Sequence, residues 1–384
     1  DAPAFSFLTD TMPDAQTPCY LTYTNEATHA VIRANLHRAP MANGVIEGIG
    51  PRYCPSIETK IARFPDKERH QLFLEPEGLH TNEIYVQGMS TSLPTDVQEE
   101  FLRTIPGMQN ARIMRPGYAI EYDCLDPLQL EASLAVKEIA GLYSAGQANG
   151  TSGYEEAAAQ GLVAGINAAR ACMGEEPLIL RRSDGYIGVL IDDLVTKGTE
   201  EPYRMMTSRA EYRLVLRQDN ADLRLTPIGR RIGLVSDARW ARFTAKRGAI
   251  DAALRLLRER RLSPSAETEA LLAGAGISPL RTPMTLFALL AREGDYRALA
   301  VFDLPPLADD VREEVEIMAR YDGYIRKQEE QIARMERLEA RRIPADTDYA
   351  AIGSLRLEAA EKLSAVRPRS IGQASRISGV SPAD

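Results

Sequence analysis

The first third of the chain alternates short apolar runs with turn-forming residues. The runs CYLTYTN (19–25) and NEIYVQGMSTSL (82–93) carry the β-branched and aromatic residues that are typical of short strands. Proline and glycine interrupt the stretches LEPEGLHTNE (74–83) and RPGYAIEYD (115–123), as they do in loops between strands. We therefore expect residues 1–130 to be rich in β-strands.

The pattern changes over residues 131–175. An apolar run, GLYSAG (141–146), suits a buried strand, and the glycine-rich turn GQANGTSG (146–153) follows it. Next comes YEEAAAQGLVAGINAAR (154–170), which is rich in alanine and predicts a helix. The segment is thus expected to form a strand, a glycine turn and a helix. Small residues should let one side of this helix pack flat on a sheet: Ala157, Ala158, Gly161, Ala164, Gly165 and Ala168.

From about residue 176 onward the pattern is mainly helical. Residues 309–342 predict one long amphipathic helix that Pro344 closes, because apolar residues recur at steps of three, four or seven. The stripe consists of Val311, Val315, Met318, Tyr321, Ile325, Ile332, Met335 and Leu338. It is expected to pack on neighbouring elements, and docking of a partner is the less favoured alternative. The final stretch, IGQASRISGVSPAD (371–384), begins like a further helix.

These changes predict four segments: a β-rich region (1–130), a strand–turn–helix segment (131–175), an arginine-rich connection (176–225) and a helical domain (226–384). A chain of 384 residues can build more than one core. It begins with neither a methionine nor the basic and apolar regions of a signal peptide. We therefore expect a piece of a longer protein, cut at both ends.

Composition argues against several classes of protein. No run of about 18 apolar residues is present, so no transmembrane helix is predicted. The four cysteines, Cys19, Cys54, Cys124 and Cys172, form no C-x-x-C pair, and no H-E-x-x-H motif occurs. Neither a disulfide framework nor a zinc site is expected, and a reducing cytoplasm is the predicted compartment.

The net charge of −8 argues against nucleic-acid binding by the surface as a whole. Locally, however, residues 203–231 hold seven arginines and no lysine against three acids, a balance of 7 − 3 = +4. An acidic protein can still hold RNA or phosphate at such a segment.

The glycine turn combines several features of a ligand site. Ser152 and Glu155 match a capping box, and acidic residues suit the positive end of a helix. Gly146, Gly150 and Gly153 let backbone amides come close to a ligand there. Helix packing alone is the structural alternative, but turn, cap and helix together favour a nucleotide or flavin contact. The dinucleotide fingerprint G-x-G-x-x-G is absent, so this loop would not hold a pyrophosphate in the usual way.

The stretch GPRYCPSIETKIARF (50–64) places Cys54 between two prolines. Pro55 suits the first position of a helix, which would make Cys54 the N-cap residue. The helix dipole and a nearby Arg52 or Lys60 would then stabilise a thiolate. Taken on the residues alone, a buried and inert cysteine is the commoner outcome.

The segments 50–64 and 145–169 closely resemble the two signature segments of the MnmG (GidA) family, flavoproteins that modify the wobble uridine of certain tRNAs. The stretches LEPEG, STSLP, RPGYAIEYD, EPYRMMTSRAEYRL and SIGQASRISGV are similar to the same family. The resemblance spans about residues 5 to 384. The family's N-terminal Rossmann segment has no counterpart in this sequence.

The resemblance implies a partial α/β fold of the FAD/NAD-binding, glutathione-reductase-like type, with a β-rich insertion and an all-α C-terminal domain. Gln147 matches the family position that contacts FAD, and segment 50–64 matches the NAD-binding segment. The expected FAD site comprises Gly146, Gln147, Asn149, Gly150, Thr151, Gly153, Tyr154 and Glu155. The expected NAD site comprises Gly50, Pro51, Arg52, Tyr53, Cys54, Pro55, Ser56, Ile57, Glu58, Thr59, Lys60, Ile61, Ala62, Arg63 and Phe64.

The implied activity is FAD- and NADH-dependent addition of an aminomethyl or carboxymethylaminomethyl group at the 5-position of the wobble uridine. Methylenetetrahydrofolate would supply the one-carbon unit, the GTPase MnmE would be the partner, and the protein would be a cytoplasmic homodimer. The fragment alone is expected to be inactive. One alternative is a folate- and FAD-dependent tRNA uracil-5-methyltransferase, which the helical region 226–384 disfavours. The other is a non-catalytic module that binds tRNA or a partner.

The resemblance makes Cys54 the candidate catalytic residue. A thiolate that adds to the 6-position of uracil makes the 5-carbon electron-rich, and a role near the nicotinamide and flavin stays open. Glu58 is expected to be structural rather than a proton carrier. Cys19, Cys124 and Cys172 are expected to be packing residues.

The arginine segment is expected to contact tRNA. Guanidinium groups suit phosphates, and tyrosines can stack on an unpaired base. The candidates are Arg204, Arg209, Tyr212, Arg213 and Arg217. The alternative is that the arginines pair with nearby acids in a structural network. No metal ligand is expected.

Overall fold

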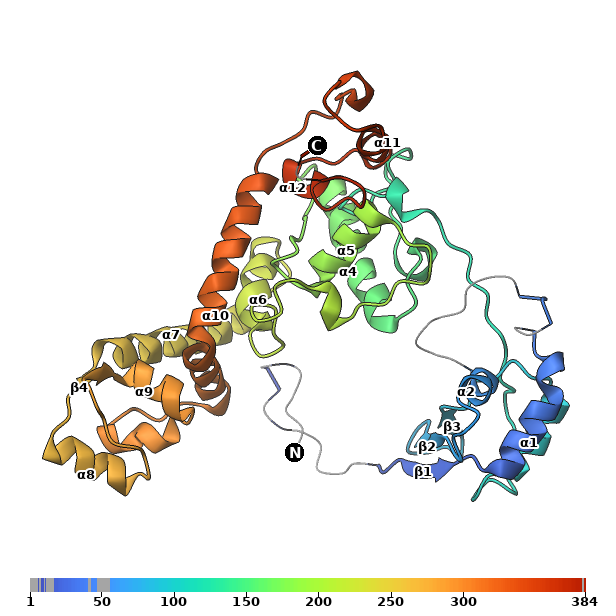
Figure 1. Cartoon of the computed structure of the whole chain (residues 1–384), viewed down its shortest axis with the longest axis horizontal. Coiled ribbons are helices and arrows are strands. Elements are labelled where there is room, and N and C mark those ends of the chain that lie inside the picture. Colours follow the sequence, from blue (N-terminus) through green and yellow to red (C-terminus); the bar gives the residue numbers. More distant parts are fainter. Residues whose placement is uncertain are drawn as a thin grey trace. The chain divides into compact units, whose positions relative to one another are not determined.

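The computed structural model describes residues 6, 8, 9, 11, 17–40, 43–46, 56–381 and 383–384. The chain divides into two compact units, and each is described by itself (Figure 1). Unit 1 comprises Asp1–Pro127, Ala145–Ala158 and Thr199–Arg204, and unit 2 comprises Leu128–Ser144, Ala159–Gly198 and Met205–Asp384. Helices and strands are both present, and the predicted mixed α/β class is confirmed.

Unit 1 contains an antiparallel three-stranded sheet with the strands in the order β1–β2–β3. The strands are β1 (Tyr20–Tyr23), β2 (Gln71–Pro76) and β3 (Ile84–Gln87). Tyr20 pairs with Leu74 across β1 and β2, and the same Leu74 pairs with Val86 of β3. The strands predicted within 19–25 and 82–93 are thereby confirmed.

Three helices, α1 (Glu26–Asn35), α2 (Ile57–Arg63) and α3 (Thr95–Arg103), belong to the same unit. Each contributes to one apolar core, through Ile32, Ile61 and Phe101 respectively. Helices occupy more of the described part of residues 1–130 than strands do, so the expectation of a mainly β region needs correction. The helices are short, and a side-chain cap marks the start of α1, because the Asn25 side chain accepts a hydrogen bond from the Thr28 amide.

Unit 2 is mainly helical, as predicted for the chain after residue 176. Its α-helices include α5 (Tyr186–Lys197), α6 (Ala221–Arg231), α7 (Asp237–Glu259), α8 (Ala266–Gly274), α9 (Leu286–Glu293), α10 (Asp309–Glu339) and α11 (Leu357–Val366). A short helix, α12 (Ile371–Ala374), follows them. Helix α4 (Tyr154–Cys172) begins in unit 1 and continues in unit 2. The paired strands β4 (Arg261–Leu262) and β5 (Met284–Thr285) precede α8 and α9. Six 3₁₀ helices complete the described elements: Leu36–Arg38, Pro127–Gln129, Gly146–Asn149, Thr207–Arg209, Arg297–Phe302 and Tyr349–Ala351.

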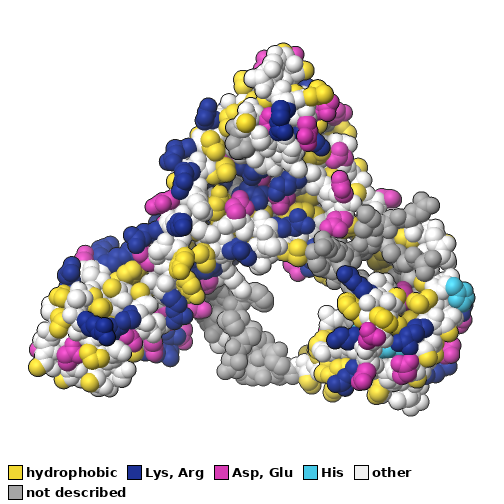
Figure 2. All heavy atoms as spheres, viewed as in Figure 1, with side chains coloured by type: hydrophobic (Ala, Val, Ile, Leu, Met, Phe, Trp, Pro, Cys, Tyr) yellow, Lys and Arg dark blue, Asp and Glu magenta, His cyan; other side chains and the backbone are white. Residues whose placement is uncertain are grey.

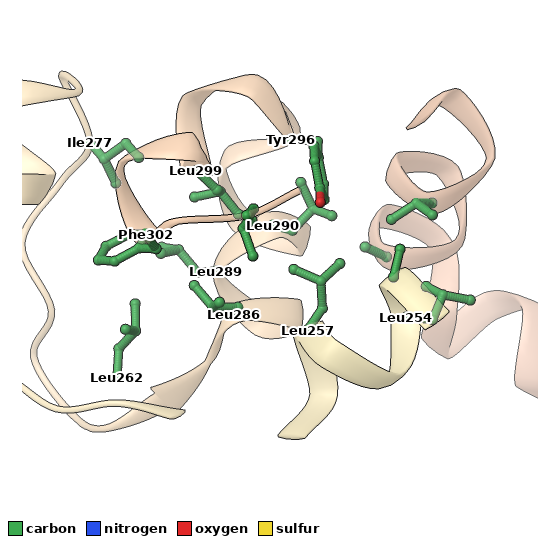
Figure 3. Packing of buried hydrophobic residues seen from close by; sticks show 14 of the residues in the cluster. Leu254, Leu257, Leu262, Ile277, Leu286, Leu289, Leu290, Tyr296, Leu299 and Phe302 are labelled. Carbon is green, nitrogen blue, oxygen red and sulfur yellow. The ribbon is translucent and has the colours of Figure 1, made fainter. Parts of the chain in front are cut away.

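The largest core of unit 2 lies between α7, α9 and α10 (Figure 3). Leu257 of α7 and Leu289 and Leu290 of α9 are fully buried, and Phe302 and Tyr296 close the cluster. Aliphatic side chains at helical spacing on each helix supply this burial, which accounts for the stable helical domain.

Helix α10 confirms the long helix predicted from the apolar stripe. Its first turns bury Val311 and Val315 in the core between α7, α9 and α10. Tyr321, however, is 39% exposed, so the stripe is not buried along its whole length. Farther along, Ile332 packs against a second cluster that contains Val189 and Tyr212. The helix therefore packs on different neighbours along its length.

Glu314 of α10 predicts a pH dependence of stability. Its side chain is buried and accepts a hydrogen bond from Arg217 Nη2 (2.7 Å), while burial and the nearby Asp219 carboxyl raise its pKa from 4.5 to about 7. The folded protein therefore holds this proton more tightly than the unfolded chain, and this contribution to stability falls as pH rises from 4.5 to about 7. The Glu314→Gln variant is expected to show a flatter stability profile over this range in urea unfolding. An unchanged slope would contradict the assignment.

Two predictions about the segment around α4 are wrong. Residues 141–146 do not form the predicted buried strand: Tyr143 makes a single bridge with Ala135, and Leu142 is exposed. A strand needs a ladder of backbone partners, and the apolar run alone does not supply one. The small-residue side of α4 does not pack flat along its whole length either: Ala164 is buried, but a Cβ added at Gly161 or Gly165 would meet no described atom within 4 Å.

Candidate functional site

The glycine turn has the tight geometry that its sequence predicts. Residues Gly146–Asn149 form a 3₁₀ turn, and Gly146 and Gly150 have φ angles of 81° and 76°. A Cβ at Gly150 would lie 2.6 Å from Thr199 Cγ2, so both the conformation and the space require glycine there. The Thr151 hydroxyl donates to the Gly146 carbonyl oxygen (2.9 Å) and closes the turn.

A segment about fifty residues later in the chain pairs with this turn. The Tyr203 amide donates to the Gly150 carbonyl oxygen (2.7 Å), and the Ser152 amide donates to the Tyr203 carbonyl oxygen (3.1 Å). The Tyr203 side chain is buried, and Thr151 and Tyr203 form a parallel bridge. Backbone hydrogen bonds to Tyr203 thus hold the glycine turn in place.

The predicted capping box does not describe the start of α4. The helix begins at Tyr154, and the Ala157 amide donates to the Gly153 carbonyl oxygen, which makes Gly153 the N-cap residue. The Ser152 hydroxyl instead approaches the Tyr203 carbonyl oxygen at 3.5 Å. Glu155 is largely exposed, and its carboxylate lies 3.3 Å from Arg204.

A pocket of about 140 Å³ lies beside the turn in unit 1. It is lined by Ile46, Ile120, Glu121, Tyr122, Cys124, Gln147, Gly150, Thr151, Thr199, Glu200, Glu201 and Pro202. The apolar part of this lining and the side-chain amide of Gln147 suit the edge of a flat heteroaromatic ring system. The carboxylates of Glu121, Glu200 and Glu201 disfavour a phosphate group at this position, because like charges repel. The pocket therefore fits the ring end of a cofactor better than its pyrophosphate.

The described part of the predicted NAD segment forms α2. Its N-cap residue is Ser56, whose side chain accepts a hydrogen bond from the Thr59 amide (3.3 Å). The sequence predicts that this helix begins at Pro55, but it begins at Ile57. Lys60 Nζ donates to the Gly88 carbonyl oxygen (3.2 Å), so this lysine is engaged within unit 1. Gly50, Pro51, Arg52, Tyr53, Cys54 and Pro55 lie outside the described residues.

Glu58 of α2 is a buried acid with an incomplete set of partners. Its side chain is 3% exposed, and Oε1 accepts hydrogen bonds from the Ser92 amide (2.8 Å) and hydroxyl (2.7 Å). The Oε2 atom has no hydrogen-bond partner among the described residues. The contacts through Oε1 support the structural role that was favoured from the sequence.

The other three cysteines are exposed, which contradicts the prediction that they are packing residues. Cys19 immediately precedes β1, and Cys172 ends α4, where the last turn is open to solvent. Cys124 lines the pocket beside the glycine turn. Cysteine is often buried, but these three side chains are exposed because of where they lie: before a strand, at the end of a helix and at a pocket wall.

Most candidates in the arginine segment have internal partners. Arg217 pairs with Asp219 (2.9 Å) and Glu314 (2.7 Å), and Arg204 pairs with Glu155 and Glu156. Tyr212 is buried and does not present a stacking face in this structure. Arg213 is exposed and Arg209 is half-buried. These ion pairs agree with the structural alternative for part of this segment. Over the face of the molecule shown in Figure 2, Lys and Arg side chains lie among Asp and Glu side chains.

Sequence reasoning missed the charged network that holds the segment in unit 2. The buried Arg182 donates to both oxygens of Glu211 (2.7 and 2.8 Å), to Asp192 (3.0 Å) and to Asp193 (2.8 Å). Arg376 donates from the C-terminal residues to Asp192 (2.8 Å for each of two bonds). Burial would raise the pKa of Asp193, but Lys197 and Arg182 outweigh it and hold this pKa below its ordinary value. No local pattern marks Arg182, because its partners are distant in sequence.

The described part of the chain shows neither a metal site nor a membrane-spanning helix. No group of three or more His, Cys, Asp or Glu side chains there is arranged to hold a metal ion. Among the helices described, none combines the length and the apolar character needed to cross a membrane.

Three family models match the chain. Residues 1–176 match "Glucose inhibited division protein A". Residues 237–329 match "tRNA modifying enzyme MnmG/GidA C-terminal helical domain", and residues 331–384 match the C-terminal helical bundle of the same enzyme. Together the three models account for most of the chain.

Similar proteins point the same way. A protein of Caldicellulosiruptor saccharolyticus named "tRNA uridine 5-carboxymethylaminomethyl modification enzyme MnmG" is 59% identical over 383 residues, and one of Clostridium botulinum with the same name is 56% identical. The match covers 99% of this chain but 61% of each relative. A crystal structure of Aquifex aeolicus GidA is 45% identical with a TM-score of 0.86, again over 99% of this chain and 61% of that one. The chain therefore belongs to the MnmG/GidA family.

Proposed function

We propose that this chain acts in the modification of uridine in tRNA, as part of an enzyme that uses FAD and NADH. The observation that carries the proposal is the glycine turn with its pocket, in a chain that matches relatives of that name over nearly its whole length. Because the chain spans about 61% of those relatives, the activity of the whole protein is an inference for this chain.

The residues of the turn have definable roles in this proposal. Gln147 would bind the polar edge of the FAD ring system, and the backbone between Gly146 and Thr151 would shape the wall beside it. The flavin supplies redox chemistry when it is bound. The apolar side chains of Ile46 and Ile120 would line that edge of the pocket.

Cys54 is the proposed catalytic residue. Its thiolate would add to the 6-position of the uracil, which makes the 5-carbon nucleophilic toward the incoming one-carbon unit. When the 5-carbon then loses its proton, the thiolate leaves and the ring is restored. Glu58, four residues later in the sequence, fixes the start of α2 through its hydrogen bonds from Ser92.

The remaining parts of the proposal rest on the family resemblance. They are methylenetetrahydrofolate as one-carbon donor, the GTPase MnmE as partner, a homodimer, a cytoplasmic location and NAD binding at segment 50–64. A tRNA surface would be formed by the exposed Arg213 together with the half-buried Arg209. The finer product, an aminomethyl or carboxymethylaminomethyl group, is part of the same proposal.

The proposal is tested by the absorption spectrum of the protein expressed from the full-length gene in which this chain is encoded. The purified protein is expected to carry bound flavin, and NADH is expected to bleach the flavin absorption. A protein that binds tRNA but takes up no flavin would instead support a non-catalytic module. Methylated rather than aminomethylated uridine in the treated tRNA would support the methyltransferase alternative.

A further inference from the structure

We infer that Arg204 is a positioning residue of the glycine turn, because its guanidinium holds the buried Glu156 carboxylate over Gly153. The contacts that carry this inference lie within unit 1 and do not depend on any ligand. Its consequence for flavin binding rests on the proposed function of the turn. Arg204 is thereby assigned to the cofactor turn rather than to the tRNA surface.

Glu156 lies in the first turn of α4, where an acidic residue is favoured by the helix dipole. Its side chain is only 2% exposed, so the carboxylate has lost most of its water. A buried charge needs a charged or hydrogen-bonding partner to offset that loss. Arg204 Nη1 lies 3.1 Å from Glu156 Oε2, and Nη2 of the same guanidinium lies 3.3 Å from Glu155. One side chain therefore holds both acids of this helix turn.

The ion pair lies directly against the backbone of the turn. A Cβ built on Gly153 would lie 1.6 Å from Arg204 Nη1 and 1.7 Å from Glu156 Oε2. Ser, Thr, Asp or Asn is otherwise preferred at the N-cap, but any of them at Gly153 would have to push the ends of the Arg204 and Glu156 side chains aside. The guanidinium and the carboxylate together fill the space that a side chain at this position would take.

The neighbour of Arg204 is bonded to the same turn through its backbone. Tyr203 donates to the Gly150 carbonyl oxygen (2.7 Å) and accepts from the Ser152 amide (3.1 Å). Residues 203 and 204 therefore act as one clamp: the backbone of Tyr203 pairs with the turn, and the side chain of Arg204 fixes the helix that follows it. Loss of the guanidinium should loosen Gly150 to Ala157 even when no ligand is present.

Hydrogen exchange of the amides between Gly150 and Ala157, measured without flavin, tests the inference directly. Arg204→Ala is expected to speed exchange there by about tenfold or more, since a local opening would no longer have to break the ion pair. Arg38→Ala is the matched control: Arg38 is 37% exposed against 33% for Arg204, and it pairs with the exposed Asp96 in the same unit. It should leave exchange in the turn unchanged.

Two further variants separate positioning from general destabilisation. If Arg204 acts by holding the Glu156 charge, the double variant Arg204→Ala with Glu156→Gln should recover much of the lost protection, because a neutral amide needs no cation. Arg204→Lys keeps the charge without the two-armed contact and should give an intermediate rate, which also keeps the test informative if Arg204→Ala folds poorly.

Flavin and tRNA titrations of the same variants show the consequence. Arg204→Ala should weaken flavin binding by about tenfold or more, with a much smaller change in tRNA affinity. Unchanged exchange in Arg204→Ala, or a loss confined to tRNA affinity, would overturn the inference. Faster exchange with normal flavin binding would uphold the clamp and instead refute the proposed flavin role of the turn.

Discussion

Replacing Arg182 by methionine is expected to lower the free energy of unfolding by about 3 kcal/mol at neutral pH, because it removes the cation from a buried charged network. The Arg182 and Asp193 side chains are 8% and 4% exposed. Methionine fills similar space but leaves Glu211 without its two-armed contact and removes the Arg182 partner of the buried Asp193. Urea unfolding at pH 7 measures the loss.

Its neighbour in sequence provides the control. Arg181 is 57% exposed and pairs with Glu336 at the surface, so Arg181→Met should cost less than about 1 kcal/mol. Wild-type stability should also decline at acid pH, since the lowered pKa of Asp193 means that the contribution from this carboxylate is lost as pH falls through that pKa. Equal losses in the Arg181 and Arg182 variants would show that burial of the network does not matter.

Replacing Gly150 by alanine is expected to weaken flavin binding by about tenfold or more, with the fold retained. The left-handed conformation at φ 76° costs an alanine roughly 1 kcal/mol, and the added methyl group would also overlap Thr199 Cγ2 at 2.6 Å. Both effects displace the turn that lines the pocket beside Gln147. Titration of the flavin, followed by its fluorescence, gives the change in affinity, and circular dichroism checks the fold.

Gly161→Ala on the same helix is the matched control for this prediction. Gly161 has helical geometry, and a Cβ there would meet no described atom within 4 Å. Alanine should therefore leave flavin binding unchanged and raise the stability of α4 by up to about 1 kcal/mol. Normal flavin affinity in Gly150→Ala would show that the cofactor does not bind at this turn.

Elements specified by local sequence were predicted well. The alanine-rich stretch forms α4, and the apolar stripe forms α10, because helical periodicity depends on residues only three or four positions apart. The glycine turn was also found, since Gly146 and Gly150 need a backbone conformation that few other residues adopt. The start of α2 was missed because Ser56, rather than the residue before Pro55, supplies the cap.

Features that depend on distant partners were not predictable in the same way. The run 141–146 is apolar enough for a strand but lacks a ladder of partners in the described structure. The contacts of Arg182 with Glu211 and of Arg204 with Glu156 join residues 29 and 48 positions apart. A count of arginines against acids gave the net charge of the segment but could not show which arginines are already paired. Which arginines are paired depends on the folded structure, in which Arg213 is exposed.

The most direct test of the central claim is nucleoside analysis of tRNA from a bacterial strain that lacks its own enzyme of this family and carries the full-length gene in which this chain is encoded. The wild-type gene is expected to restore the 5-substituted wobble uridine, and so is Cys172→Ser, which changes an exposed cysteine at the end of α4. Cys54→Ser is expected to abolish the modification while the purified protein keeps its flavin. Normal modification by Cys54→Ser would contradict the proposed role of this thiol, and failure of the wild-type gene to restore any modified uridine would contradict the proposed function itself.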